Sequence, residues 1–568
     1  MGDLLNKFYD KAKQSNAIRA LANLPILSNI KERIMTHILL QDRNHESWIS
    51  KHLEHRKTLY CSTAEPGLLS FITTVWNTPV QYLKILAESL LVQAKVHDFE
   101  WIVLDNGSKD EDTINYLNDL ASNSFVKLYK VEDNMGIIGG MNYCLQKASG
   151  RYVLPLDSDD YLYPDALSIL TWHIKEFNYP SILYSDEDKI IKNKSVMPYF
   201  KPDWDPVLFL NSAYIAHLGA FDRKLAIKLN VYKNSDAEGC HDWDTFIKFM
   251  IANHKPVHIP EIIYSWRMHK DSTAMNISSK SFIRESHKSI LNRFISGLPN
   301  SDDYQLVNNP FFQGKNDWWI KRVNKSSAKM LTIVLRTGND SNMAMLRDTC
   351  KNLHHDTLSL KMNSNPTVLL EILHSSNYDL VSFVSENIRI SNPNWDLEAL
   401  SLFEIHKDVV MIGGLTFNKR QKVVGAGIYF GVGNLCDTPY KDLSIKDPIY
   451  NSILKRQHSV SAFHTQLCVF EISFLVDFLK HACPDSASLS FLGMWAGAYA
   501  LRENKRVAYS PFISAKTEEN WDELIQRPEK LEFLKHNKDI IPDTRYYHKL
   551  FNVKNGKEFQ PKLHDCST

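Results

Sequence analysis

Residues 151–165 read RYVLPLDSDDYLYPD, an apolar run that leads into a cluster of carboxylates. The run 152–156 combines β-branched and other apolar residues without a helical repeat, which predicts a short buried strand. Side chains two apart in an extended chain point the same way. We therefore expect Asp157 and Asp159 to converge on one point while Asp160 faces elsewhere.

A pair of converging carboxylates predicts a cation between them. Mg²⁺ and Mn²⁺ prefer such hard oxygen ligands, and both can also hold a diphosphate. The sequence therefore predicts a divalent metal site at Asp157 and Asp159. The alternative is an Asp-rich turn before a helix that Pro164 would begin, and these residues alone leave both interpretations open.

Length and composition limit the class of protein. A chain of 568 residues with 44% hydrophobic and 23% charged residues is too long for one core, so we expect two large domains. The net charge is +1, which provides no chain-wide field to recruit nucleic acid. The eight cysteines form no CxxC pair, and this fits a reducing cytoplasm.

The first 60 residues predict helices. Leucine and isoleucine recur at spacings of three and four, and lysine and arginine fill the other faces. Such a segment either packs on the next domain, which we favour, or lies on an anionic membrane. The N-terminus lacks the apolar centre of a signal peptide, and no run of 18 apolar residues occurs. We therefore expect a chain that is neither exported by that route nor membrane-spanning.

Strands and helices alternate after this segment. The predicted strands are 68–75, 100–104, 126–131 and 152–156, and the predicted helices are 80–93, one from 111, and 141–147. This alternation predicts a parallel sheet with helices on both faces, whose ligands bind beyond the strand C-termini. Thr73, Asp105, Asp133 and Asp157 fall at that rim.

Six motifs follow one another over about residues 60–300. They are DNGSKD, NMGIIGGMNYCLQKASGRYVLPLDSDD, YSDEDK, YFKPDWDP, GCHDWD and HIPEIIYSWRMHKDSTA. This series resembles the family-2 glycosyltransferases, and most of all the bacterial enzymes that build rhamnose-containing and other surface polysaccharides. The resemblance implies a GT-A fold, a Rossmann-like and mostly parallel sheet flanked by helices, and sugar transfer with inversion at the anomeric carbon.

The resemblance also implies a donor site. Its donor-binding residues would be Thr73, Thr74, Asp105, Asn134, Gly136, Asn142, Asp157 and Arg267. Asp105 would accept the imide N–H of uracil or thymine, although an Asx-turn or helix N-cap is the alternative for this residue. Asp157, Asp159 and His269 would hold Mn²⁺ or Mg²⁺, which neutralises the departing diphosphate.

On the acceptor side, the resemblance implies hydroxyl contacts from Asp186, Lys201, Trp204 and His241. Asp242 matches the general base, because a sugar hydroxyl is a poor nucleophile until a carboxylate takes its proton. The alternative is that Asp242 only caps its helix. His241 stands where the family usually has an acidic or amide residue, a departure that concerns the acceptor.

The pattern begins again near residue 331. The stretches LTIVLRTGND, YDLVSFVSENIRI and KDVVMIGGLTFNKRQKVVGAGIYFG repeat the strand and loop layout of the first half. Ser385-Glu386-Asn387 replaces the paired acids, and Trp495-Ala496 replaces the acidic pair of the base motif. A single Glu is a weak metal site, so we expect a degenerate GT-A-like domain kept for packing, acceptor binding or assembly.

These observations give five predicted parts: a helical segment 1–60, a catalytic GT-A domain 61–308, a linker 309–330, a degenerate GT-A-like domain 331–545 and a tail 546–568. The predicted function is a metal-dependent, inverting hexosyl- or deoxyhexosyltransferase. It would use a UDP- or dTDP-sugar and extend a glycan or lipid-linked glycan of the cell surface, such as O-antigen or capsule. We expect it in the cytoplasm, with contact to the inner face of the cytoplasmic membrane as an open alternative.

Two other functions are weighed against this one. A sugar nucleotidyltransferase also uses paired carboxylates, but no glycine-rich basic loop follows the first predicted strand to cradle a triphosphate. A non-catalytic glycan-binding or assembly subunit would need no acid set. The presence of Asp105, Asp157, Asp159 and Asp242 argues against that function.

Overall fold

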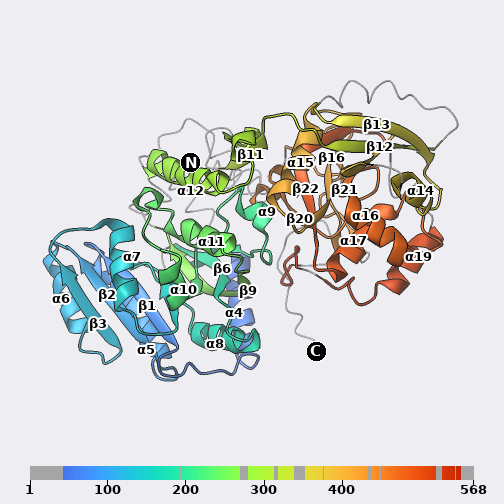
Figure 1. Ribbon diagram of the computed structural model, residues 1–568. Helices are drawn as coiled ribbons and strands as arrows, with labels where there is room; N and C mark the ends of the chain where they lie inside the picture. The colour runs from blue at the N-terminus through green and yellow to red at the C-terminus, as the bar shows by residue number, and fades with distance from the viewer. Residues whose placement is uncertain are drawn as a thin grey trace, which may run out of the picture. The chain divides into compact units, whose positions relative to one another are not determined.

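The computed structural model describes residues 43–191, 194–268, 279–312, 317–337, 352–374, 377–432, 436–446, 450–519, 527–543 and 545–551. Among these, residues 43–204 and 213–296 form a first compact unit, and residues 205–212 and 297–551 form a second (Figure 1). The helices predicted before residue 43, and the predicted metal ligand His269, lie outside the described residues.

The first unit is built on one mixed sheet with the strand order β3-β2-β1-β4-β8-β6-β9-β5, and β7 pairs with β6. The strands are β1 Leu69–Val75, β2 Glu100–Asn106, β3 Val126–Val131, β4 Tyr152–Pro155, β5 Tyr161–Leu162, β6 Ile182–Ile191, β7 Lys194–Tyr199, β8 Gly219–Asp222 and β9 Val257–Arg267. The first four strands of this order are parallel, and β8 is antiparallel to both β4 and β6. The predicted parallel sheet is confirmed for the strands that the alternating pattern identified.

Helices connect these strands. They are α4 Arg43–Arg56, α5 Val80–Gln93, α6 Glu111–Leu120, α7 Gly136–Lys147, α8 Ala166–Glu176, α10 Arg223–Lys228, α11 His241–Ile251 and α12 Ser279–Ser296, with η1 Ser235–Ala237 before α11. Helix α6 begins where Asp110 accepts a hydrogen bond from the Thr113 amide. Helix α5 buries Leu83, Leu86 and Leu90 against the sheet, which explains their spacing.

The strand register positions the acidic turn. Leu154 of β4 lies beside Phe71 of β1, and Val75 at the end of β1 lies beside Asp105 of β2. Phe71, Trp101 and Leu154 are fully buried in one core cluster. The loops after β1, β2 and β4 therefore leave the sheet at the same edge, as the sequence predicts.

The second unit repeats this architecture with the strand order β13-β12-β14-β21-β16-β22-β15. Its strands are β12 Lys329–Arg336, β13 His354–Lys361, β14 Leu380–Ser385, β15 Arg389–Ile390, β16 Val409–Phe417, β17 Val423–Gly425, β18 Tyr429–Phe430, β19 Cys436–Asp437, β20 His458–Val460, β21 Leu467–Glu471 and β22 Arg506–Lys516. Its helices are α14 Val368–His374, α15 Trp395–Ile405, α16 Ile472–His481, α17 Leu492–Arg502 and α19 Arg527–His536, with η4 Tyr450–Lys455.

The two sheets correspond in the order and direction of their strands, except that β3 has no counterpart among the described residues of the second unit. In both, a parallel group at one side meets one antiparallel strand, β8 or β21, which then pairs with the first strand of a parallel pair, β6–β9 or β16–β22. The prediction of two tandem domains of one α/β fold is confirmed. Within the described part of the second unit, only α14 lies between β13 and β14, where the first unit has α6, β3 and α7.

Two segments depart from the predicted division of the chain into consecutive domains. The segment predicted as a linker contains η3 Pro310–Phe312 and β11 Trp318–Arg322, and β11 forms a hairpin with β10 Tyr304–Asn308, which follows η2 Ser301–Asp303 just before that segment. Asp205–Ser212, which contains the short helix α9 Pro206–Phe209, belongs to the second unit. Val207 is buried in the core of that unit, and Asp205 accepts hydrogen bonds from the amide and hydroxyl of Ser459.

Within the described ranges, no helix combines the length and the apolar character needed to cross a membrane.

Candidate active site

The acidic loop after β4 is a turn rather than an extended segment. A turn at Ser158 and Asp159 brings the Asp160 amide to 3.4 Å from the Asp157 carbonyl. The ligand atoms of Asp157, Asp160 and His217 lie within 4.8 Å of one another. The expectation that Asp160 faces away from Asp157 is therefore wrong, because the turn ends the two-residue alternation of a strand.

Asp160 is fully buried at the base of this turn. Its carboxylate accepts the Tyr264 hydroxyl at 2.5 Å and the Arg267 amide at 2.8 Å. Burial, together with the charges of Asp157 and Asp159, raises the pKa of Asp160 well above its usual range. A cation bound beside Asp157 would favour the charged form of Asp160.

Arg267, at the end of β9, supports the turn from behind. Its Nε donates to the Asp159 carbonyl at 2.6 Å, and its guanidinium lies 5.1 Å from the centre of the Tyr82 ring. The side chain is largely buried. Arg267 thus lies beside the predicted metal-binding turn, where its positive charge offsets the charge of the acids.

His217, which the sequence analysis did not single out, lies between two acids. Its Nε2 is 3.5 Å from Asp157 Oδ2 and its Nδ1 is 3.5 Å from Glu187 Oε2. The imidazole stacks on Tyr264, with ring centres 4.9 Å apart and planes at 5°. Burial alone would lower the pKa of His217, but the two carboxylates raise it well above its usual range. The only sequence signal for His217 was its place shortly before a strand. Many histidines with a purely structural role have the same placement.

Lys201 and Glu187 hold His217 in place from the side of the core. The Lys201 ammonium donates to Ser185 O at 2.7 Å, to Glu187 Oε2 at 3.1 Å, and to the His217 carbonyl. Burial alone would raise the pKa of Glu187, but Lys201 and His217 lower it to about 2. Glu187 is therefore an anion at neutral pH.

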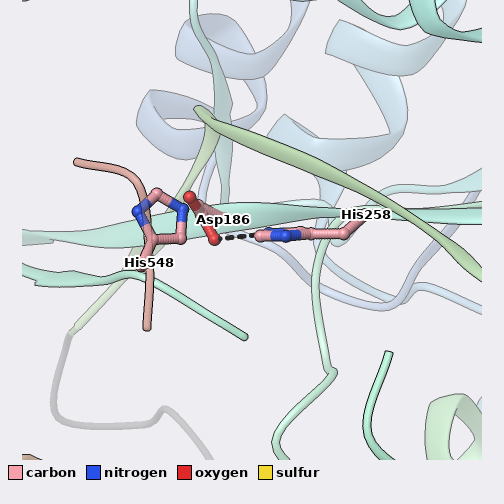
Figure 2. Close-up of side chains that lie close together, drawn as sticks. All are labelled: Asp186, His258 and His548. Atoms are coloured by element: carbon pink, nitrogen blue, oxygen red, sulfur yellow. Dashed lines mark hydrogen bonds and ion pairs between the residues drawn. The ribbon is translucent and has the colours of Figure 1, made fainter. Parts of the chain in front are cut away.

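Asp186 lies on the same strand, β6, with its side chain in the core. Figure 2 shows Asp186 and His258 pointing toward each other, with Nε2 of His258 at 2.9 Å from Asp186 Oδ1. The Lys201 amide donates to the same oxygen at 2.8 Å, and Trp204 is also buried. Neither the Asp186 nor the Lys201 side chain reaches the surface in this structure, so direct hydroxyl contacts would require both to become exposed.

Asp242 is the second residue of α11. The N-cap position is held by Cys240, without a side-chain hydrogen bond. The alternative that Asp242 caps this helix is therefore wrong, because the helix begins at His241, two residues earlier than a cap at Asp242 would require. Asp242 is 23% exposed, and its Oδ1 lies 3.6 Å from His241 Nε2.

The surroundings of Asp242 make it more basic than a free carboxylate. Burial raises the pKa of Asp242, the charges of Asp157 and Glu187 raise it further, and His241 and His217 act in the opposite direction. The neighbouring Asp244 is engaged elsewhere, because it pairs with Lys248 at 2.8 Å and with Arg293 at 2.7 Å.

The rim of β1 and β2 carries the remaining predicted donor contacts. Asp105 accepts a hydrogen bond from the Ser108 amide at 3.0 Å, so its side chain stabilises the loop after β2. The Thr73 hydroxyl accepts the Trp101 indole N–H at 2.9 Å, and Thr73 is fully buried. A Cβ at Gly140 would meet the Thr74 methyl at 2.5 Å, so α7 needs glycine there to approach β1.

Helix α7 begins at Gly136, whose φ of 72° favours glycine. Asn134 accepts the Gly136 amide at 2.8 Å, and Glu238 accepts the next two amides, of Ile137 and Ile138, at 2.5 and 3.1 Å. A carboxylate thus satisfies the amides at this helix start. Further along α7, Asn142 Oδ1 is buried with no hydrogen-bond partner among the described residues.

The first unit is an α/β domain with acidic loops at the C-terminal ends of its parallel strands. Domains of this class bind their ligands at that edge of the sheet. The family model for glycosyl transferase family 2 matches residues 70–229. The first unit therefore contains a glycosyltransferase family 2 domain, and the predicted resemblance is confirmed.

Similar proteins extend the comparison. Uncharacterized protein y4gI of Sinorhizobium fredii is 23% identical over 408 residues, 65% of this chain and 44% of that protein. O-antigen biosynthesis protein RfbC of Myxococcus xanthus is 21% identical over 410 residues, 66% of this chain and 31% of that protein. The crystal structure of S. aureus TarS 1–349 in complex with UDP-GlcNAc has a TM-score of 0.33 and 20% identity, over 40% of this chain and 67% of that fragment. The chain thus spans less than half the length of these two curated relatives.

Proposed function

We propose that the first unit transfers a hexosyl or deoxyhexosyl group, with inversion, from a UDP- or dTDP-sugar to a hydroxyl of a cell-surface glycan. The observation that carries this proposal is the convergence of Asp157, Asp160 and His217 in a domain of glycosyl transferase family 2. Asp242 lies close enough to Asp157 for their charges to interact.

The ligand atoms around Asp157 suit a divalent metal. Carboxylate oxygens together with an imidazole suit Mn²⁺, and carboxylates alone suit Mg²⁺. Asp157, with Asp160 and His217 or with the predicted ligand Asp159, would hold the ion. When bound, the metal neutralises the negative charge of the departing diphosphate.

Asp242 would act as the general base. Its raised pKa gives it a stronger proton affinity than an ordinary carboxylate has. The acceptor hydroxyl would approach Asp242 from the side of His241, whose ring nitrogen lies 3.6 Å from the carboxylate. The proton would move from the acceptor oxygen to Asp242 as the new glycosidic bond forms.

The nucleoside would bind at the ends of β1 and β2. Asp105 lies at this edge with Thr74 near it, and Asn134 and Gly136 form the adjoining start of α7. Thr73 is instead buried in the core, where its hydroxyl is bonded to Trp101. The glycan acceptor is proposed because the sequence resembles bacterial enzymes that build surface polysaccharides. It would be a lipid-linked glycan at the inner face of the cytoplasmic membrane. The second unit would bind the acceptor or support assembly.

Incubation of the full chain with UDP-glucose, UDP-galactose, UDP-N-acetylglucosamine and dTDP-rhamnose tests this proposal. Release of nucleoside diphosphate is measured with Mn²⁺, with Mg²⁺ and with a chelator. We expect release with one class of donor, and its loss with chelator. Binding of glycans without release of any nucleotide would instead support a glycan-binding subunit, and release of pyrophosphate from a nucleoside triphosphate would support a nucleotidyltransferase.

A further inference from the structure

Tyr232 has a backbone and a side chain that packing alone does not explain. It follows α10, and its φ of 58° places a non-glycine residue in the left-handed region. The side chain is 3% exposed and packs near Phe221, with ring centres 6.2 Å apart. The hydroxyl has no hydrogen-bond partner among the described residues.

A buried hydroxyl without a partner destabilises the folded state, because it gives up its hydrogen bonds to water. Phenylalanine would fill the same space beside Phe221 without that loss. Since the hydroxyl does not contribute to packing, we expect a bound ligand to supply its hydrogen-bond partner.

A second buried polar atom faces the same neighbourhood. The His241 ring lies 5.7 Å from the Tyr232 ring, and His241 Nδ1 also has no hydrogen-bond partner among the described residues. His241 is itself buried and directly precedes Asp242. Two polar atoms beside the predicted base are thus left unsatisfied.

The charges near Tyr232 indicate what it can bind. Burial, with the charges of Asp242 and Asp157, raises the pKa of Tyr232 well above its usual range. The phenol is therefore protonated at neutral pH and can donate a hydrogen bond. Two neighbouring carboxylates disfavour a phosphate or another anion at this position. A neutral hydroxyl fits, because it can accept from the phenol and donate to a carboxylate.

We propose that the Tyr232 hydroxyl contacts the transferred sugar, donating a hydrogen bond to one of its hydroxyl groups between Asp157 and Asp242. His241 Nδ1 is the second protein atom available to that sugar. This inference rests on the proposed glycosyltransferase function and adds to it a residue that selects the sugar. A site built to bind a hydroxyl discriminates strongly against a sugar that lacks it.

The test is Tyr232→Phe in the full chain, with Tyr152→Phe as the matched control. Tyr152 is also fully buried, but its hydroxyl donates to the Pro180 carbonyl at 2.6 Å. We expect Tyr232→Phe to keep or raise the melting temperature and to lower kcat/KM at least tenfold with the best donor of the four. Tyr152→Phe should lower the melting temperature and leave kcat/KM within about twofold of wild type.

Binding of UDP alone separates the sugar from the nucleotide. We expect Tyr232→Phe to bind UDP, measured by calorimetry with Mn²⁺, as wild type does, and to bind the UDP-sugar more weakly. If Tyr232→Phe weakened the binding of UDP as much as that of the UDP-sugar, the proposed sugar contact would be overturned. A lowered melting temperature with unchanged kinetics would show that the hydroxyl holds a buried water, and would also overturn it. An inactive wild-type chain that binds none of the four donors would refute the proposed function, and this inference with it.

Discussion

The two units share the order of their central strands but differ in the residues that follow β4 and β14. In the first, β4 leads to the turn with Asp157, Asp159 and Asp160. In the second, β14 leads to Glu386, whose Oε1 accepts from the amide and hydroxyl of Thr337 at 2.6 and 2.7 Å. The Glu386 carboxylate thus stabilises a loop. The same backbone position carries the proposed metal-binding acids in one unit and a loop contact in the other.

The strands β6 and β16 differ in the same way. In β6, the register against β9 first shifts after Ser185, and the next residues are Asp186, Glu187 and Asp188. In β16, the register against β22 shifts after Gly414, and the next residues are Leu415, Thr416 and Phe417. Buried acids destabilise a fold unless each one is paired. In β6, Asp186 pairs with His258 and Glu187 pairs with Lys201, whereas Leu415 and Phe417 of β16 need no such partner.

One backbone irregularity has a different use in each unit. In β9 it contains Glu261, which contacts His52 at 2.6 Å and Arg56 at 3.3 Å on the helix α4. In β22 it contains Phe512, which stacks on Trp319 of β11 with ring centres 3.9 Å apart. Each irregularity thus anchors the element that precedes its sheet, by charge in the first unit and by aromatic packing in the second.

The strongest test of this contrast is Asp242→Asn, which removes the proposed proton acceptor. We expect turnover to fall by roughly 10² to 10⁴, with little change in donor affinity or melting temperature. The matched control in the second unit is Glu386→Gln, which should keep turnover near wild type. An Asp242→Asn chain that retained more than about a tenth of wild-type turnover would contradict the base assignment.

Replacing Arg56 tests the polar anchor of the first unit. Arg56 is almost fully buried and pairs with Asp165 through two hydrogen bonds of 2.8 Å. Arg56→Met leaves Glu261 and Asp165 without this partner, so we expect the first unit to lose about 3 kcal/mol of unfolding free energy. Urea unfolding followed by hydrogen-exchange mass spectrometry reports each sheet separately. Equal loss of protection in β12 and β14 would show that the anchor is not local to the first unit.

The two units should respond to pH in opposite directions. In the second, burial lowers the pKa of His406 and of His458 to about 4, so the unfolded state binds more protons between about pH 6.5 and 4. Its stability therefore falls on acidification, by about 2 kcal/mol for each of these histidines at pH 5. In the first, burial alone would lower the pKa of His217 and His258, but their carboxylate partners raise it. That stabilisation is complete below pH 6.5 and is lost as the pH rises through the folded-state pKa.

Unfolding of the full chain at pH 5, 6.5 and 8, followed by exchange protection in β1 and β14, measures this difference. The variant His406→Gln should remove about half of the acid sensitivity of the second unit. A common direction for both units would show that other groups dominate their pH dependence.

The smallest expected effect concerns the metal. Asp159→Ala should weaken Mn²⁺-dependent binding of UDP about tenfold or more, because a carboxylate ligand contributes directly to the ion's affinity. Calorimetry with and without Mn²⁺ checks this. Glu386→Ala serves as the matched change in the second unit and should have no effect. Unchanged Mn²⁺-dependent affinity in Asp159→Ala would assign the ion to Asp157, Asp160 and His217 alone.

Local patterns in the sequence determined most of the architecture. The predicted strand 126–131 and helix 80–93 have the bounds of β3 and α5, because turn residues and caps mark the ends of such elements. The repeat after residue 331 and its missing acids were visible for the same reason. Asp157 and Asp242 were predicted as site residues because family motifs mark them.

Only the tertiary structure decided which residues meet. It joined Asp160 and His217 to Asp157, placed Lys201 in the core behind Glu187, and brought Tyr232 beside His241. These residues lie far apart in sequence or follow a turn that breaks strand alternation, so no periodicity links them. The membership of Asp205–Ser212 in the second unit has the same origin. Periodicity reports only the local backbone and its buried face, whereas contacts between distant residues depend on how the whole chain packs.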